Sequence, residues 1–191
     1  MAIKKMICIG FKSFRKRTVI NFDADGFTAI VGANGSGKSN IIDAFVFVLG
    51  ALSAKSLRAN TIKDLISNGG HGMGPSDTAS VEIIFDNADR SISLDLPEIS
   101  IIRKIDRKGN GIYKLNGKRS TRKAIINLLD LSGILPNSSN MIMQGELFRL
   151  INMNSNERRE LVEDIAGIAS YNDKKLSAED ELMQVQTNLG R

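Results

Sequence analysis

The residues Gly32-Ala33-Asn34-Gly35-Ser36-Gly37-Lys38-Ser39-Asn40 decide how this sequence folds. They contain the pattern Gly-x-x-x-x-Gly-Lys-Ser, with a β-prone run over 27–31 before it and an apolar helical run over 41–49 after it. Glycines adopt backbone conformations that other residues avoid, so successive N–H groups can point inward around a phosphate at a helix N-terminus. The stretch is therefore predicted to be a Walker A loop between a strand and a buried helix that ends at Gly50.

The chemistry of such a loop assigns roles to its side chains. Lys38 is expected to reach the β- and γ-phosphates as a point charge, and the Ser39 hydroxyl to ligate Mg²⁺. The residues of the stretch that we expect to bind the nucleotide are Gly32, Asn34, Gly35, Ser36, Gly37, Lys38, Ser39 and Asn40. The predicted cofactors are therefore ATP and Mg²⁺.

Short β-prone runs flank the loop on both sides. They cover 3–9, 18–22 and 27–31 before the helix, and 81–85, 91–96, 99–105 and 112–115 after it. Arg107-Lys108-Gly109-Asn110-Gly111 is predicted to close a hairpin, and Asn116-Gly117 a second tight turn. These runs predict an α/β fold in which a mixed sheet has an antiparallel, β-rich part.

The last third of the chain is predicted to be mainly helical. A helix is expected over 121–131 and a short strand over 141–143. From Asn154 onward charged and apolar residues alternate at helical spacing, and the run 171–189 favours the start of a coiled coil over an ordinary surface helix. We therefore expect a lobe over 1–153 and a helical neck with the start of a coiled coil over 154–191.

Composition excludes several classes of protein. One cysteine cannot form an internal disulfide, and one histidine, in a Gly-rich segment predicted to be a loop, cannot build a zinc cage or readily serve a hydrolase. No apolar run approaches the roughly 18 residues that a membrane span needs, so the protein is expected in the cytoplasm. The net charge is +5, and residues 1–60 carry nine Lys and Arg against three Asp and Glu, which suits an anionic ligand.

Several segments together closely resemble the N-terminal head segment of SMC proteins of archaeal or bacterial type, the chromosome-organising ATPases of the ABC-type superfamily. The similar segments are 10–14, 27–40, 49–50, 53–58, 143–146, 157–159 and 165–169. The resemblance spans nearly the whole chain. It implies the N-terminal lobe of an ABC-type ATPase head.

The resemblance also implies roles for residues outside the loop. Gln144 would be the Q-loop glutamine, a Mg²⁺ ligand that helps to place the attacking water. Arg58 would approach the phosphates and sense the nucleotide, and Lys12 and Ser13 would contact the nucleotide from its side. Asp64 is a weaker candidate for contact with the base or ribose. Lys38, Gln144 and Arg58 are thus the residues expected to act in catalysis.

The family's ATP site needs two elements that this sequence lacks, a Walker B carboxylate pair and a Leu-Ser-Gly-Gly signature. Leu131-Ser132-Gly133-Ile134 shares three letters with the signature but is read as coincidence. In SMC proteins both elements lie in a C-terminal part that returns through a long coiled coil. The chain is therefore expected to be an N-terminal lobe that is inactive in ATP hydrolysis by itself.

The resemblance implies partners and a place in the cell. Expected partners are the C-terminal lobe of the same protein, a second SMC head in an ATP-dependent dimer, DNA, and an accessory subunit of the kleisin type, but no membrane. ATP binding and hydrolysis would drive head engagement for chromosome condensation and segregation, and the protein would associate with the chromosome or nucleoid.

Other functions remain open on the sequence. A DNA-repair ATPase can share the same head plan, and a small-molecule kinase or a GTPase shares the loop, although the sequence lacks the Asn-Lys-x-Asp motif of a GTPase. A non-enzymatic DNA-binding module is a further alternative. It would use the basic residues of the predicted hairpin, which are Arg103, Lys104, Arg107, Lys108, Lys114, Lys118 and Arg119.

Overall fold

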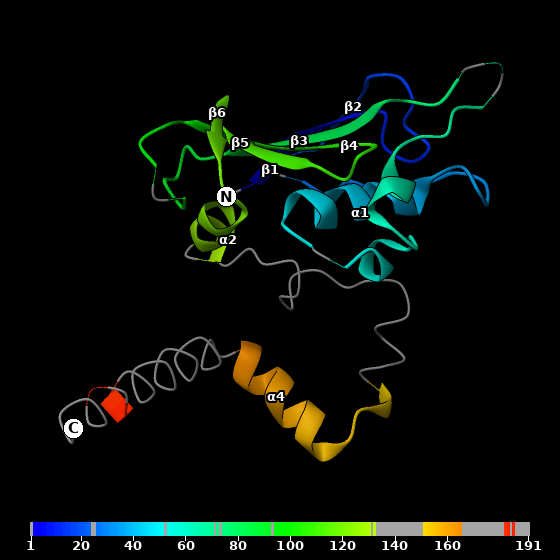
Figure 1. Ribbon diagram of the computed structural model, residues 1–191. Coiled ribbons are helices and arrows are strands. Elements are labelled where there is room, and N and C mark those ends of the chain that lie inside the picture. The colour runs from blue at the N-terminus through cyan, green and yellow to red at the C-terminus, as the bar shows by residue number, and fades with distance from the viewer. Residues whose placement is uncertain are drawn as a thin grey trace. The chain divides into compact units, whose positions relative to one another are not determined.

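The computed structural model describes residues 2–130 except 24, 25, 52, 71, 73 and 93, together with 132, 151–165, 182, 183 and 185. The chain forms two compact units, Met1–Pro136 and Asn137–Arg191. The first unit contains the Walker A loop and a sheet (Figure 1). The boundary predicted from the sequence, between 153 and 154, lies within the second unit.

The sheet has six strands in the order β2-β1-β3-β4-β5-β6. Its strands are β1 (Ala2–Ile9), β2 (Thr18–Asn21), β3 (Thr78–Asp86), β4 (Glu98–Asp106), β5 (Gly111–Leu115) and β6 (Lys118–Ser120). Five of them match strands predicted from the sequence. All pairings between these described strands are antiparallel, so the antiparallel part of the prediction is confirmed, and none of the described pairs makes the sheet mixed.

Alternation of apolar residues explains why the central strands form. In β3, Ala79, Val81, Ile83 and Phe85 are buried while the residues between them are partly exposed. β4 repeats the pattern, and the register aligns buried positions of the two strands, such as Ile83 with Ile101. One face of the sheet therefore carries the core.

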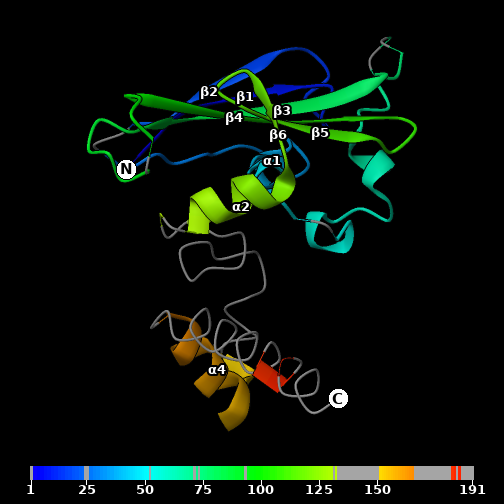
Figure 2. The same ribbon diagram turned by 60° about the vertical axis from the view of Figure 1, so that its left-hand side comes forward.

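Two helices lie on this apolar face, α1 (Lys38–Val48) and α2 (Arg122–Asp130), as Figures 1 and 2 show from two directions. α1 is apolar nearly all round, and the ring of its Phe47 lies 5.2 Å from that of Phe11. The helix ends at Val48, and Gly50 then takes a φ of +104°, a value that glycine adopts without strain. The helix predicted to end at Gly50 is thus confirmed.

Two arginines hold the C-terminal end of α1. Nη1 of Arg103, a buried residue of β4, donates hydrogen bonds of 2.8 Å to the carbonyls of Phe47 and Ala51. Its guanidinium also lies 4.3 Å from the centre of the Phe47 ring, and burial lowers the pKa of Arg103. Arg122 donates from Nε to the carbonyl of Gly50 at 2.7 Å. The carbonyl of Phe47 near the helix end, and those of Gly50 and Ala51 just beyond it, are thereby tied to β4 and α2.

Two runs predicted to be strands are not strands. The run 27–31 forms no strand with the described residues, and Phe27 and Val31 are 90% and 89% exposed. A strand needs a neighbouring backbone, and the described part of the first unit provides none beside this run. In 91–96 the chain instead wraps around buried Asn87, whose amide donates to the carbonyls of Ile92, Leu94 and Leu96.

Short elements complete the first unit. The 3₁₀ turns η1 (Lys55–Leu57) and η2 (Ile62–Leu65) follow α1, and both bury a leucine. The turn predicted at Asn116-Gly117 is present, with a positive φ at both residues, and it leads into β6, a strand that the sequence analysis did not predict.

The second unit contains α4 (Ser155–Ile165). Asn154 and Glu157 form a reciprocal cap, in which the side chain of each accepts a hydrogen bond of 2.9 Å from the backbone N–H of the other. The predicted helix starting at Asn154 is thus confirmed. The predicted strand 141–143 lies outside the described residues, as does the run 171–189 except at 182, 183 and 185. None of the described helices is long and apolar enough to cross a bilayer.

We expect Arg103→Ala to lower the free energy of unfolding by about 3 kcal/mol, because it leaves a cavity and removes the donor to two carbonyls. Arg119→Ala, at an exposed position of β6, should change it by less than about 0.5 kcal/mol. Denaturant unfolding of both variants measures the difference. Equal midpoints for the two would contradict the capping role of Arg103.

Candidate nucleotide-binding site

The predicted Walker A loop is exposed and leads directly into α1. Gly35 and Gly37 have φ values of +78° and +93°, and a backbone bond of 3.2 Å from Ser36 N–H to the Ala33 carbonyl tightens the turn. Gly37 precedes the first residue of the helix, and no side chain caps the helix start. The first N–H groups of α1 therefore face the loop, where they can bind an anion.

Ser13, in the turn after β1, lies against the same loop. A Cβ at Gly37 would come within 2.6 Å of the Ser13 hydroxyl oxygen, a distance too short for any side chain. That oxygen accepts a hydrogen bond of 2.9 Å from the side-chain amide of Asn40. Residues 13, 37 and 40, all predicted to bind the nucleotide, are thus brought together.

Lys38 folds back over the loop. Its Nζ donates to the carbonyls of Gly32 and Ala33, at 2.6 and 2.7 Å. These are neutral acceptors, and a phosphate oxygen is a stronger, charged one. The ammonium is therefore at the place where a bound phosphate would compete for it.

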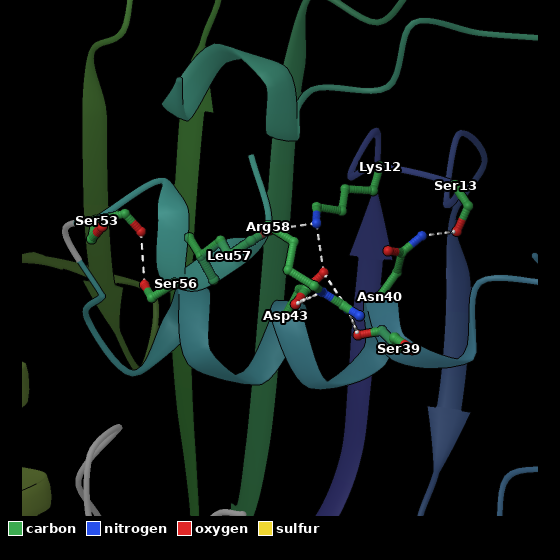
Figure 3. A network of polar contacts seen from close by, with 9 residues as sticks. All are labelled: Lys12, Ser13, Ser39, Asn40, Asp43, Ser53, Ser56, Leu57 and Arg58. Atoms are coloured by element: carbon green, nitrogen blue, oxygen red, sulfur yellow. Dashed lines mark hydrogen bonds and ion pairs between the residues drawn. The ribbon is translucent and has the colours of Figure 1, made fainter. Parts of the chain in front are cut away.

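A buried carboxylate organises the other side of the helix start (Figure 3). Asp43 of α1 has no exposed surface. Its Oδ2 accepts hydrogen bonds from Lys12 Nζ at 2.5 Å and from Arg58 Nη2 at 2.7 Å, and its Oδ1 accepts from Arg58 Nε at 3.1 Å. Lys12 also donates to the Leu57 carbonyl at 2.5 Å, and Arg58 Nη2 to the Ser39 carbonyl at 2.6 Å.

This network places Lys12 and Arg58 beside the first turn of α1. The two residues are far apart in the sequence, and the resemblance alone suggested that they belong to one site. Asp43, which joins them, was not predicted. The available signal was an ionisable residue inside the otherwise apolar run 41–49, where a charge needs a partner.

One candidate residue makes a different contact among the described residues, and another lies outside them. The Asp64 carboxylate accepts a hydrogen bond of 2.7 Å from Thr61 N–H and caps η2. Its contact with a base or ribose stays a prediction. Gln144 lies outside the described residues, so its role as a metal ligand also stays a prediction.

Other chemistry considered from the sequence finds little support. Arg103 is buried against Phe47, which removes it from the basic hairpin surface proposed for a DNA-binding module. Burial raises the pKa of the Cys8 thiol to about 12, so it is a neutral thiol and a poor nucleophile. No cluster of three or more His, Cys, Asp or Glu side chains suited to a metal occurs among the described residues, and His71 lies outside them.

A family model described as the RecF/RecN/SMC N terminal domain matches residues 2–178. The chain belongs to this family. Within it the chain is an N-terminal SMC head segment. It is 47% identical to the chromosome partition protein Smc of Pyrococcus furiosus and 37% identical to that of Bacillus subtilis, over 99% and 100% of its length. It spans 16% of the length of each of these relatives.

Solved SMC heads have the same fold. One structure, from work on ATP-driven dimerisation and DNA-stimulated activation of SMC ATPases, matches with a TM-score of 0.82 and 47% identity, covering 86% of this chain and 99% of that one. A Pyrococcus furiosus Smc head with an extended coiled coil, bound to the C-terminal domain of ScpA, matches with a TM-score of 0.84 and 48% identity. That match covers all of this chain and 48% of the other. The predicted fold class, an α/β ABC-type ATPase head lobe, is confirmed.

We expect Gly37→Ala to destabilise the SMC segment by about 1 to 2 kcal/mol, because alanine is strained at this positive φ and its Cβ meets the Ser13 hydroxyl. Ser13→Ala removes the hydroxyl, so the double variant should recover part of this loss. Thermal unfolding of the three variants gives the coupling. Strictly additive losses would contradict the close packing of Ser13 on the loop.

Proposed function

We propose that this chain is the ATP-binding N-terminal half of an SMC head, and that ATP binding and hydrolysis in the complete head drive head engagement on DNA. The observation that carries the proposal is the convergence of the Walker A loop with three cations, Lys38, Lys12 and Arg58, at the start of α1. Three positive charges around unsatisfied helix N–H groups suit a polyphosphate better than a single phosphate.

The residues present also fit Mg²⁺. The Ser39 hydroxyl is attached to the first turn of α1, next to the loop that would hold the phosphates, and hydroxyl and amide oxygens are ligands that Mg²⁺ accepts. When bound, Mg²⁺ neutralises charge on the β- and γ-phosphates. Ser39 would hold the ion from the loop side, and Gln144 is proposed as its second protein ligand.

The exposed run 27–31 supports the C-terminal lobe as a partner. Phe27 and Val31 present large apolar side chains to solvent in a segment that forms no strand with the described residues. Such a segment is stabilised when a neighbouring strand pairs with it and covers its side chains. We propose that the C-terminal lobe provides that strand, together with the Walker B carboxylates that the chain lacks.

The wider assembly is proposed from the relatives. One solved relative comes from work on ATP-driven dimerisation and DNA-stimulated activation of SMC ATPases, and another is a Smc head bound to the C-terminal domain of ScpA. For this chain we propose a second SMC head, DNA and a subunit of the kleisin type as partners, with chromosome association. Exposed Lys104, Lys108, Lys114 and Lys118 offer phosphate contacts for DNA.

The competing functions are not favoured. A DNA-repair ATPase shares the head plan, but the Pyrococcus furiosus and Bacillus subtilis relatives, at 47% and 37% identity, are chromosome partition proteins. A stand-alone DNA-binding module would not need the phosphate-directed arrangement of Lys38, Lys12 and Arg58.

We expect Lys38→Ala, in the intact head that contains this chain, to weaken ATP binding by at least about tenfold, because the loop then lacks its own cation. Lys123→Ala, at an exposed position of α2, is the matched control and should bind as wild type does. Titration calorimetry measures both. An unchanged affinity in Lys38→Ala would overturn the proposed ATP site.

We further expect the 191-residue chain alone to hydrolyse ATP at the background rate, and addition of the C-terminal lobe to restore slow turnover. In-line attack needs a carboxylate that positions water and donors from the opposing head that stabilise the γ-phosphate, and the sequence contains neither the Walker B carboxylate pair nor the Leu-Ser-Gly-Gly signature. The restored rate should rise more than linearly with head concentration, since two heads must meet.

A steady-state ATPase assay across a concentration series measures this restoration. Val31→Asp, which places a charge on the exposed run, should reduce it without changing the fold of the chain. Robust turnover by the chain alone after repurification would show that a complete site lies within it, against the half-head proposal.

A further inference from the structure

We propose that Asp43 is a positioning residue for nucleotide binding, an inference that rests on the ATP site proposed above. Its buried carboxylate holds Lys12 and Arg58 beside the first turn of α1, so that both cations face the phosphates bound by the loop. Asp43 itself would not touch the nucleotide.

The burial of Asp43 is the first argument. The other buried residues of α1 are Ile41, Ala44, Val46, Phe47 and Val48, all apolar. Removing a carboxylate from water is costly even when it is paired, and an apolar residue in such a place often gives equal or greater stability. Stability alone therefore does not account for a charge at this position. What the charge does is fix two cations.

The second argument is the arrangement of the three charges from buried to exposed. The side-chain exposure is 0% for Asp43, 13% for Lys12 and 41% for Arg58. The anion thus lies inside, Lys12 is largely buried beside it, and Arg58 lies toward solvent. Two cations share one carboxylate, so the group keeps a net positive charge. The two cations can therefore neutralise the buried carboxylate and still leave a positive charge that attracts an anion.

The geometry of Arg58 is the third argument. Nε and Nη2 of Arg58 donate hydrogen bonds to the two different oxygens of the Asp43 carboxylate. This fork of two hydrogen bonds fixes the plane of the guanidinium. Nη2 also donates to the Ser39 carbonyl, which sets the distance of the guanidinium from the start of α1. A lysine at position 58 could supply the charge, but not this orientation.

The backbone provides the fourth argument. Lys12 and Arg58 both adopt a positive φ, +44° and +51°, which is unfavourable for residues with a side chain. Both lie in turns, and Arg90 and Asn116 are the other such residues in the described part. Strained residues persist where surrounding contacts determine them, and here both strained residues reach the same carboxylate. The Lys12 contact with the Leu57 carbonyl further joins the two segments.

The experiment measures ATP affinity by calorimetry in the intact head. Asp43→Asn keeps the shape but removes the charge, and we expect roughly tenfold weaker ATP binding. Asp95→Asn is the matched control, because Asp95 pairs with Arg90 at 3.0 Å on the surface and is 98% exposed. It should bind ATP as wild type does. Unchanged or tighter binding by Asp43→Asn would overturn the proposal.

A double-variant comparison separates positioning from general damage. In a Lys12→Ala/Arg58→Ala background, Asp43→Asn should cause less than about a twofold further loss of ATP affinity, because there are no cations left to position. A carboxylate needed only for folding would cause the same loss in both backgrounds. That result would overturn the proposal.

Arg58→Lys keeps the test decisive if Asp43→Asn does not fold, since position 58 is partly exposed and the charge is retained. Loss of the fork should weaken ATP binding nearly as much as Arg58→Ala does. Wild-type affinity in Arg58→Lys would show that orientation by Asp43 is unimportant. The ATP affinities of the wild-type and Lys38→Ala heads, measured alongside, test the proposed ATP site independently of Asp43. A wrong ATP site would leave Lys38→Ala unchanged, whereas a wrong role for Asp43 would leave only the Asp43 and Arg58→Lys variants unchanged.

Discussion

The pairing of one fully buried carboxylate with two cations is the interaction on which the candidate site depends. Asp43 lies in the helix, Lys12 in the turn after β1, and Arg58 after η1. A buried charge must be paired. When α1 packs against the sheet and buries Asp43, the segments that carry Lys12 and Arg58 must therefore pack beside it. The loop ahead of α1 then has a cationic surface beside it as well as helix N–H groups in front of it.

The sequence predicts those parts of the fold that depend on local pattern. Alternation in β3 and β4, the Gly-Lys-Ser pattern and the helical spacing from Asn154 onward each specify structure within a few residues. The run 27–31 has the same β-prone composition but lacks a paired neighbour, which composition cannot reveal. In 91–96 the chain is shaped by the side chain of Asn87, whose hydrogen bonds no periodicity encodes.

The residues of the candidate site also differ in how far the sequence predicts them. The loop residues follow from the motif, and Lys12 and Arg58 from resemblance. Asp43 could have been suspected because a carboxylate interrupts an apolar helix, but its partners depend on the tertiary fold. Arg103 was predicted to lie on an exposed surface because the residues around it are basic. In the structure, strand alternation in β4 turns its side chain toward the core.

The two arginines at the far end of α1 have a mechanical consequence. Arg103 and Arg122 tie the carbonyls of Phe47 and Gly50, at and just beyond the end of α1, to β4 and α2, while Arg58 ties its first turn to the segment after η1. Hydrogen bonds at both ends restrain the helix against bending or sliding when the loop in front of it is displaced. A displacement of the loop is therefore expected to be passed on through α1 to the sheet.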